Sequence, residues 1–228
     1  MAKIEVAPEN WVGRLWTDNP DDWLERVYAI AASWRIPWDD GQAHPMLLDW
    51  LKRNPLDTSR KVLDAGCGLG YNAEAFAAHG FKVTAFDVSS SAVETCRFYS
   101  AGHSAVGAAR RKSVSYQQAD LLAPPVRWRR RFDVVFEAAL LQVLADPKET
   151  MQRALHNLCG FVKPGGTLMT ICRLRTRTTP QNRRPPWHFE LAELRRITAD
   201  EGFVLQEHVT RKTAGVTRAL LSFSRSSS

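Results

Sequence analysis

The stretch from Lys61 to Gly70, which reads KVLDAGCGLG, constrains the fold more than any other part of the chain. Its first half is a short apolar run typical of a buried strand, and its second half places glycine at every other position. Glycine lacks the Cβ atom that would hold a ligand away from the backbone, and it permits tight turns. A helical pattern begins at Tyr71, and a helix N-terminus offers unpaired N–H groups. The stretch therefore predicts a strand, a turn and a helix beside a bound small molecule.

Downstream of this stretch, apolar segments alternate with helical patterns, which is the signature of βαβ units and a parallel sheet. Strands are expected at 62–65, 81–86, 114–118, 132–136 and 167–172, with helices at 71–79, 89–99 and 148–161 between them. A turn at 163–166, a long exposed loop at 174–187, a helix at 190–201 and strands at 203–210 and 216–224 complete the pattern. The predicted fold class is α/β: a Rossmann-like, doubly wound, seven-stranded sheet, mostly parallel with the last strand antiparallel, and helices on both faces.

The domain organisation follows from length and patterning. We expect residues 1–228 to form a single domain, with a helical N-terminal cap (1–55) over the ligand site and a Rossmann-like core (56–225). The scattered cysteines predict neither a metal site nor a disulfide framework. There is no apolar run of the roughly 20 residues that span a bilayer, and the first ten residues lack a signal pattern. A cytoplasmic protein without membrane contact, monomeric or dimeric, is expected.

Acidic residues recur at the carboxyl side of successive predicted strands, namely Asp64, Asp87, Asp120 and Glu137. Ligands of open parallel sheets bind beyond this edge. Any one of these acids could simply begin a helix, where the dipole favours negative charge. Asp87 follows the glycine turn at about the spacing of the ribose-binding acid of nucleotide folds. Together the acids and the turn predict a nucleotide-like cofactor, with an NAD enzyme as the first rival.

The motifs of residues 61–172 resemble the core of class I S-adenosylmethionine-dependent methyltransferases. The resemblance rests on the D-x-G-x-G-x-G order of Asp64 to Gly70, on Asp87 and on the VKPGG turn at 162–166. Asp64, the spacing of the glycines and the Pro-Gly-Gly turn favour a methyltransferase over an NAD enzyme, which also needs glycines and a ribose acid. The resemblance implies that Gly66, Cys67 and Gly68 line the methionine part of S-adenosyl-L-methionine and that Asp87 binds the ribose. It further implies that adenine is bordered by Asp120 and Leu121. Trp38, Asp64, Val88 and Glu137 complete the implied cofactor set.

Two further segments are similar to the thiopurine and halide/thiol methyltransferase group. They are Trp34 with the IPWDDG segment at 36–41, and the RPPW segment at 184–187. The resemblance implies that tryptophans cover the cofactor and enclose a small substrate, with Trp34, Trp38, Leu141 and Trp187 as substrate residues. The EAALL segment at 137–141 departs from that group and looks more like the Glu-x-Leu pattern of quinone-type methyltransferases. The HFEL segment at 188–191 also lacks the polar cap usual in the group.

The predicted function is transfer of a methyl group to a small-molecule nucleophile such as a thiol, a halide or a related soft atom. The alternatives are an O- or N-methyltransferase of a small metabolite, a nucleic-acid methyltransferase and, least favoured, a non-catalytic cofactor-binding protein. A soft nucleophile needs no strong base, whereas a hydroxyl or amine does. Candidate bases are His44, His188 and Glu190, but no spacing singles one out, and no catalytic base is assigned.

The net charge of +7 leaves an anionic small substrate, a nucleic acid or simple solubility open as explanations. The arginine clusters fall in predicted loops or at element ends rather than along one helix face. The arginines of the largest cluster, at 173–184, could attract an anionic substrate to the entrance of the site or simply keep the surface soluble. The end of the fourth strand also lacks the Asn-Pro-Pro-aromatic type of segment that serves a flipped base. A nucleic-acid partner is therefore disfavoured.

Overall fold

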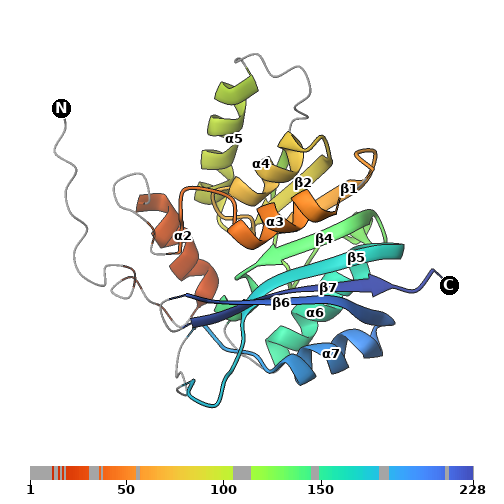
Figure 1. Cartoon of the computed structure of the whole chain (residues 1–228). Coiled ribbons are helices and arrows are strands. Elements are labelled where there is room, and N and C mark those ends of the chain that lie inside the picture. The colour runs from red at the N-terminus through yellow and green to blue at the C-terminus, as the bar shows by residue number, and fades with distance from the viewer. Residues whose placement is uncertain are drawn as a thin grey trace.

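The structure is a computed structural model of the 228-residue chain (Figure 1). It describes residues 19–30, 38–54, 57–104, 114–144, 149–179, 185–213 and 216–227, together with positions 12, 15, 17 and 36. The helices are α2 (Pro20–Ile30), α3 (Pro45–Arg53), α4 (Tyr71–Ala78), α5 (Ser90–Ser104), α6 (Glu149–Phe161) and α7 (Leu191–Asp200), with short 3-10 turns η1 (Val126–Trp128) and η2 (Leu141–Val143). The strands are β1 (Lys61–Ala65), β2 (Lys82–Asp87), β3 (Ser115–Gln118), β4 (Phe132–Ala138), β5 (Val162–Arg173), β6 (Phe203–Thr213) and β7 (Val216–Arg225).

The strands form one sheet in the order β3-β2-β1-β4-β5-β7-β6. Neighbours from β3 to β5 are parallel, and β7 runs antiparallel to both β5 and β6. The order reverses between β1 and β4, which is where ligands bind in doubly wound sheets. The predicted fold class, with seven strands and an antiparallel last strand, is confirmed.

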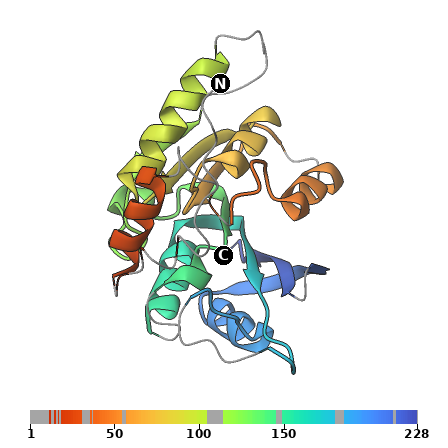
Figure 2. The ribbon, with the colours of Figure 1, turned by 90° about the vertical axis from the view of Figure 1, so that its left-hand side faces the viewer.

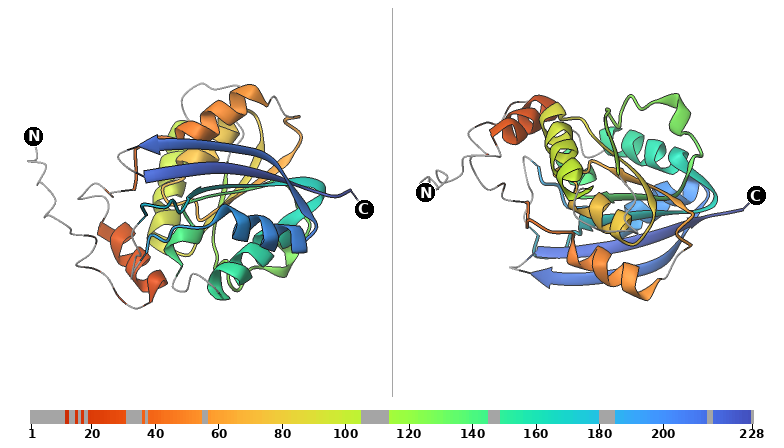
Figure 3. Two further views of the ribbon diagram at one scale, coloured as in Figure 1. Left: turned by 60° about the horizontal axis from the view of Figure 1, so that its bottom comes forward. Right: turned by 90° about the horizontal axis from the view of Figure 1, so that it is seen from above.

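Helices cover both faces of the sheet, as Figures 1 and 3 show. Apolar residues of α3, α4 and α5 pack against one face in a cluster that includes Leu47, Phe76 and Phe136. Residues of α6 and α7 pack against the other face in a cluster that includes Leu155 and Phe223. Because apolar side chains of the inner strands face both clusters, these strands read as nearly continuous hydrophobic runs in the sequence.

Helix α2 belongs to neither layer. It lies beside α5 at the carboxyl edge of the sheet (Figure 2), with which it shares a small third core. That core contains Val27 and Tyr28 of α2 together with Ala92 of α5. The described part of the cap therefore lies where the ligand of such a sheet is expected. No helix within the described ranges has both the length and the apolar character needed to cross a bilayer.

Several boundaries differ from those that the sequence predicts. Strand β4 continues through Ala138 and so includes Glu137, and β5 begins at Val162, which pairs with Phe132. The predicted turn at 163–166 is thus a bulge within β5, where the register shifts and Gly165 has a φ of 70°. The predicted loop at 174–187 is not wholly exposed, because Leu174 is buried and forms a bridge to Phe189.

Candidate functional site

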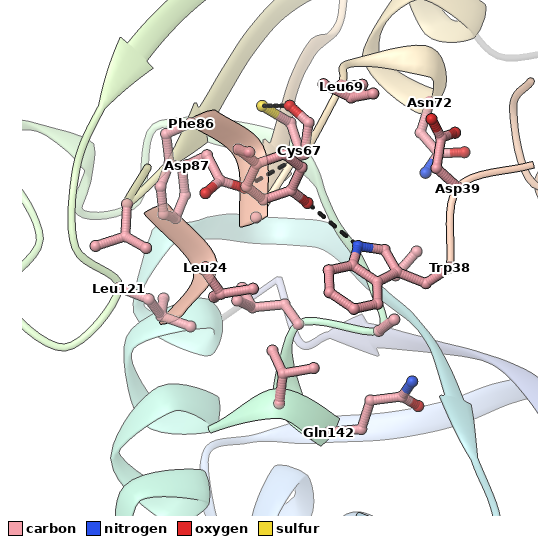
Figure 4. Close-up of a pocket in the computed structure, with 18 of the residues that line it drawn as sticks. Leu24, Trp38, Asp39, Cys67, Leu69, Asn72, Phe86, Asp87, Leu121 and Gln142 are labelled. Carbon is pink, nitrogen blue, oxygen red and sulfur yellow. Dashed lines mark hydrogen bonds between the residues drawn. The ribbon is translucent and has the colours of Figure 1, made fainter. Parts of the chain in front are cut away.

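A cavity of about 250 Å³ opens at the carboxyl ends of β1, β2 and β4, under α2 (Figure 4). Its walls come from segments far apart in the sequence: α2, the loop before α3, the glycine turn, the ends of β2 and β3, and η2. Eight of the residues predicted for the site line it: Trp38, Gly66, Cys67, Gly68, Asp87, Val88, Asp120 and Leu121. The fold therefore brings most of the predicted cofactor set together around one space.

The glycine turn follows β1 directly and is held by backbone hydrogen bonds. The N–H of Cys67 donates to the carbonyl of Phe86 at 2.9 Å, and the N–H of Gly70 donates to the carbonyl of Cys67 at 2.9 Å. Gly68 has a φ of 52°, a region that favours glycine, and a Cβ at this position would lie 2.7 Å from the Tyr28 hydroxyl. The turn thus requires glycine both for its conformation and for the close approach of α2.

Asp87, at the end of β2, is buried and joins the turn to the start of α5. Its Oδ2 accepts from the N–H of Gly68 at 2.9 Å, and its Oδ1 accepts from the N–H of Ser89 at 3.0 Å. Burial raises the pKa of this carboxyl despite the hydrogen bonds it accepts. A carboxylate has about four acceptor positions, so capacity remains for ligand hydroxyls on the cavity side.

A second acidic position lies where the chain leaves β3. The Oδ1 of Asp120 accepts from the N–H of Leu122 at 2.7 Å, which fixes the carboxylate at the cavity wall. Asp21 of α2 also lines the cavity, and burial and the negative charge of Asp120 raise its pKa. This end of the cavity therefore carries negative potential from both the core and the cap.

Asp64 and Glu137 lie behind the cavity wall. Both carboxyls are buried, and burial raises the pKa of each to about 8. Glu137 accepts from the N–H of Leu140 at 3.0 Å, from the N–H of Leu141 at 3.4 Å and from the Thr170 hydroxyl. These bonds make Glu137 a cap for η2. The cofactor contacts predicted for Asp64 and Glu137 stay predictions.

Helix α2 is fastened to the core by Glu25, a residue that the sequence did not single out. Its carboxylate accepts from the Ser89 hydroxyl at 2.6 Å, from the Ser90 hydroxyl at 3.3 Å and from both the hydroxyl and the N–H of Ser91 at 2.6 and 3.3 Å. Burial opposes ionisation of Glu25, but these hydrogen bonds outweigh it and lower the pKa. Ser89 also caps α5, because its hydroxyl oxygen accepts from the N–H of Ala92 at 3.1 Å.

The cap closes over the turn through two aromatic residues. Tyr28, which is buried, accepts a hydrogen bond from Trp38 Nε1 at 3.4 Å. The Trp38 ring is tilted against Trp23 with a centroid distance of 5.5 Å, and 39% of Trp38 remains exposed at the cavity (Figure 4). Trp34, predicted to line the substrate space, lies outside the described residues.

The far wall of the cavity is formed by η2 and the end of β5. Gln142 accepts at its Oε1 from the N–H of Arg173 at 3.1 Å, and both residues line the cavity. Leu141 is fully buried in the core behind this wall. Trp187 donates from Nε1 to the Leu144 carbonyl at 2.6 Å and braces η2. The substrate contacts predicted for Leu141 and Trp187 stay predictions.

The candidate bases are placed differently. His44 lines the cavity, but its Nδ1 accepts from the N–H of Met46 at 3.2 Å and so caps α3. Burial, with Arg218 next, lowers the pKa of His44 to about 4, so the ring is neutral at pH 7. His188 is half-buried, and burial together with Arg173 lowers its pKa. Glu190 is exposed at the start of α7.

Comparisons with known proteins agree with this geometry. The family model of thiopurine S-methyltransferase matches residues 18–219. A ubiquinone biosynthesis O-methyltransferase of Azotobacter vinelandii is 33% identical over 150 residues, which cover 63% of this chain and 59% of the relative. A protein of the same name from Aromatoleum aromaticum is 30% identical over 152 residues, which cover 63% of this chain and 58% of that relative. The chain thus spans less than two thirds of the length of these relatives.

Solved structures share the fold at low sequence identity. Magnesium protoporphyrin IX methyltransferase from Synechocystis PCC 6803, with bound S-adenosylhomocysteine, superimposes with a TM-score of 0.67 at 19% identity, covering 94% of this chain and 92% of that one. The cyclase SpnF superimposes with a TM-score of 0.73 at 15% identity, covering 100% of both chains. Because the fold carries both a methyltransferase and a cyclase, the fold alone does not decide the reaction.

Proposed function

Because this chain belongs to the thiopurine S-methyltransferase family, we propose that it transfers a methyl group from S-adenosylmethionine to a soft nucleophile, such as a thiol, on a small molecule. The predicted resemblance and its methyl-donor cofactor are confirmed at the level of the family. The observation that carries the proposal is the cavity itself. It joins the turn at Gly66 and Gly68 to the carboxylates of Asp87 and Asp120 at the switch point of the sheet.

The residues present fit the cofactor. A Cβ at Gly66 would lie 2.8 Å from the Leu140 side chain, so glycine lets these two lining residues approach each other closely in the cavity wall. Asp87 and Asp120 would hold the ribose and the adenine side, and the surrounding acids would favour a ligand that carries positive charge. When bound, S-adenosylmethionine supplies an activated methyl group on a sulfonium.

The choice of a soft acceptor follows from the groups near the far wall. Of the candidate bases His44, His188 and Glu190, His44 is the one that lines the cavity, and its Nδ1 already accepts a hydrogen bond. Burial raises the pKa of the Tyr28 hydroxyl, so this group stays protonated at neutral pH and cannot take a proton from the acceptor. An acceptor that ionises near neutral pH, as a thiol does with a pKa of about 8.5, needs no protein base. The chain then acts by aligning two reactants, which can lower a barrier by roughly 7–11 kcal/mol.

An O-methyltransferase is the second candidate, since the similar relatives named above carry that activity in their names. The two candidates differ in their pH profile. With a hydroxyl acceptor of high pKa, the rate rises with the ionisation of a protein base, whereas with a thiol it follows the pKa of the acceptor itself. Rates measured over pH 5–9 with thiols of different pKa distinguish the two.

Binding of S-adenosylhomocysteine, measured by calorimetry, tests the cofactor half of the proposal. Asp87→Ala should abolish it. The matched control is Asp133→Ala at the amino end of β4, where the carboxylate accepts from the N–H of Lys61 at 2.8 Å and pairs with Lys163. Both substitutions remove a carboxylate that caps backbone N–H groups, but only Asp87 lines the cavity. Equal affinity in the two variants removes Asp87 from its role, and no binding by the wild-type chain refutes the proposal.

A radiolabelled methyl-transfer screen over thiols, halides, phenols, amines and RNA tests the acceptor half. Labelling of thiols is expected. Labelling of phenols alone favours the O-methyltransferase candidate, and labelling of RNA alone refutes the small-molecule proposal.

A further inference from the structure

Three arginines form a row across the antiparallel part of the sheet. Arg173 of β5 is the register partner of Arg218 of β7, and Arg218 is in turn the partner of Arg211 of β6. Registered residues on neighbouring strands project from the same face with their Cβ atoms about 4.5–5.5 Å apart, and like charges placed so are destabilising. The row therefore costs folding energy unless something negative lies beside it.

Among the described residues, one end of this row is neutralised by an ion pair. Arg211 forms an ion pair with Asp49 of α3. Within the described ranges, neither Arg173 nor Arg218 has an ion-pair partner. The Nε of Arg173 is buried and has no hydrogen-bond acceptor there. A buried donor without an acceptor raises the free energy of the folded state, and an acceptor atom of a bound ligand would remove this cost.

The neighbouring row explains why the Arg173 end of the row lies at the cavity. Two residues away along each strand, Ile171, Leu220 and Val209 are likewise in register and belong to the apolar cluster that includes the buried residues of α3. The arginines lie one step beyond this apolar row on the same face, toward the N-terminus of α3. There Arg173 lines the cavity, and the positive charge of Arg218 lowers the pKa of His44, which also lines the cavity.

The two ends of the cavity therefore differ in charge. The cofactor acids that line the cavity follow β2 and β3, and Asp21 joins them from α2, whereas the arginines come from β5 and β7 on the other side of β4. Asp40, in the loop before α3, raises the pKa of His44, whereas Arg218 lowers it. The end next to β5 also holds Gln142, whose Oε1 is occupied by the N–H of Arg173, which leaves its amide N–H groups as donors at the cavity.

We propose that Arg173 and Arg218 form an anion-binding subsite at the acceptor end of the cavity, and that the methyl acceptor is a small acid held there by its carboxylate. The inference rests on the proposed function, because it assigns the acceptor of the same reaction. The edge of a guanidinium that carries Nε and one Nη matches the two oxygens of a carboxylate, which is why arginine recognises that group specifically. Arg173 is a specificity-determining residue that touches the substrate, and Arg218 supplies the second charge.

The test uses the full chain saturated with S-adenosylhomocysteine, so that no transfer occurs. Calorimetry compares para-methylthiobenzoate with para-methylthiobenzamide, which have nearly the same shape and differ in charge. The wild-type chain should bind the acid about 10- to 100-fold more tightly, the range expected for hydrogen bonds to a charged group. Arg173→Met keeps the apolar stem of the side chain and should abolish the preference. Arg195→Met, at an exposed position of α7, should retain it.

Two further measurements separate this role from others. Removing Arg173 relieves the repulsion with Arg218, so the melting temperature of Arg173→Met should stay the same or rise. A variant that loses affinity for S-adenosylhomocysteine while it keeps the preference for the acid would show that Arg173 holds the cofactor's own carboxylate, and this overturns the inference. Equal binding of the two probes to the wild-type chain, or binding of neither, also overturns it. Failure of the wild-type chain to bind S-adenosylhomocysteine refutes the proposed function itself.

Discussion

Gly68→Ala is the sharpest test of how the cap meets the glycine turn. At a φ of 52° an alanine incurs the cost of the left-handed region, about 1–2 kcal/mol. Its Cβ would also lie 2.7 Å from the Tyr28 hydroxyl, and overpacking of this kind typically costs about 1–3 kcal/mol. The two contributions give a loss of about 2–5 kcal/mol, and in a chain of this size each kcal/mol lowers the melting temperature by about 2–4 °C.

Two variants separate the contributions. Gly202 has a φ of 82°, and a Cβ added there would have no atom within 4 Å, so Gly202→Ala incurs only the conformational cost. Adding Tyr28→Phe to Gly68→Ala removes the hydroxyl and should return most of the steric part. The assays are thermal melting and calorimetric titration with S-adenosylhomocysteine. Gly68→Ala should bind at least about tenfold more weakly, because the turn or the cap must move by a few tenths of an ångström. Gly202→Ala should bind as the wild type does.

The reasoning fails if Gly68→Ala melts no lower than Gly202→Ala and binds S-adenosylhomocysteine with unchanged affinity. That result would mean that Tyr28 yields without cost and that α2 does not fix the shape of the turn. A double variant that is no more stable than Gly68→Ala alone would locate the strain in the backbone rather than at the hydroxyl.

Three further predictions concern stability. Burial raises the pKa of Asp64 and Glu137 to about 8, whereas ordinary values are 3.8 and 4.5. Between these pH limits the unfolded chain therefore binds fewer protons than the folded chain, so the free energy of unfolding should fall as the pH rises from about 5 to 8. In urea titrations, Glu137→Gln should make this fall less steep. The same pH dependence in the variant and the wild type contradicts the prediction. His44→Ala removes the N-cap hydrogen bond of α3 and should lower the free energy of unfolding by about 0.5–2 kcal/mol in the same assay. An unchanged free energy of unfolding would show that this cap does not stabilise the helix. The exposed ion pair between Arg53 and Glu207, at 2.6 Å, should contribute less than about 1 kcal/mol in a double-mutant cycle.

The sheet could be predicted because its signals are local. Strands buried on both faces, such as β1 and β4, read as apolar runs, and the turn at Gly66 to Gly70 marks the first crossover. The cavity residues from that turn through Asp87 and Asp120 follow from the same rule, since parallel strands end at one edge. This part of the site is a property of the topology.

The placement of Glu137 could not be predicted from the sequence. The acid at the end of a strand could face the cavity or turn back into the core, and the sequence pattern is the same for both. Here η2 follows β4 immediately, and the N–H groups of Leu140 and Leu141 draw the carboxylate away from the cavity. The length of β4 decides this, because the strand continues to Ala138 instead of stopping at the predicted residue 136.

The arginine row was equally hidden, because its members are distant in sequence and meet only through strand register. The arginine cluster at 173–184 was predicted to lie at an element end or in a loop, and Arg173 is the last residue of β5. Whether it faces Arg218 depends on the pairing of β5 with β7, which no local pattern specifies. The idea of an anionic substrate arose from the net charge and from the arginines of the 173–184 cluster, and strand register adds Arg218 as the partner of Arg173.

Ser89 explains how the cap and the cofactor acid are positioned together. Its N–H donates to Asp87, its hydroxyl donates to Glu25 of α2, and the same oxygen accepts from the N–H of Ala92 at the start of α5. One residue thus connects the end of β2, the first turn of α5 and the cap. A shift of the Asp87 carboxylate toward a ligand would therefore move Ser89 and change the position of α2 relative to the core. Because Tyr28 lies one turn beyond Glu25 on the same helix, that shift also reaches the contact with Gly68.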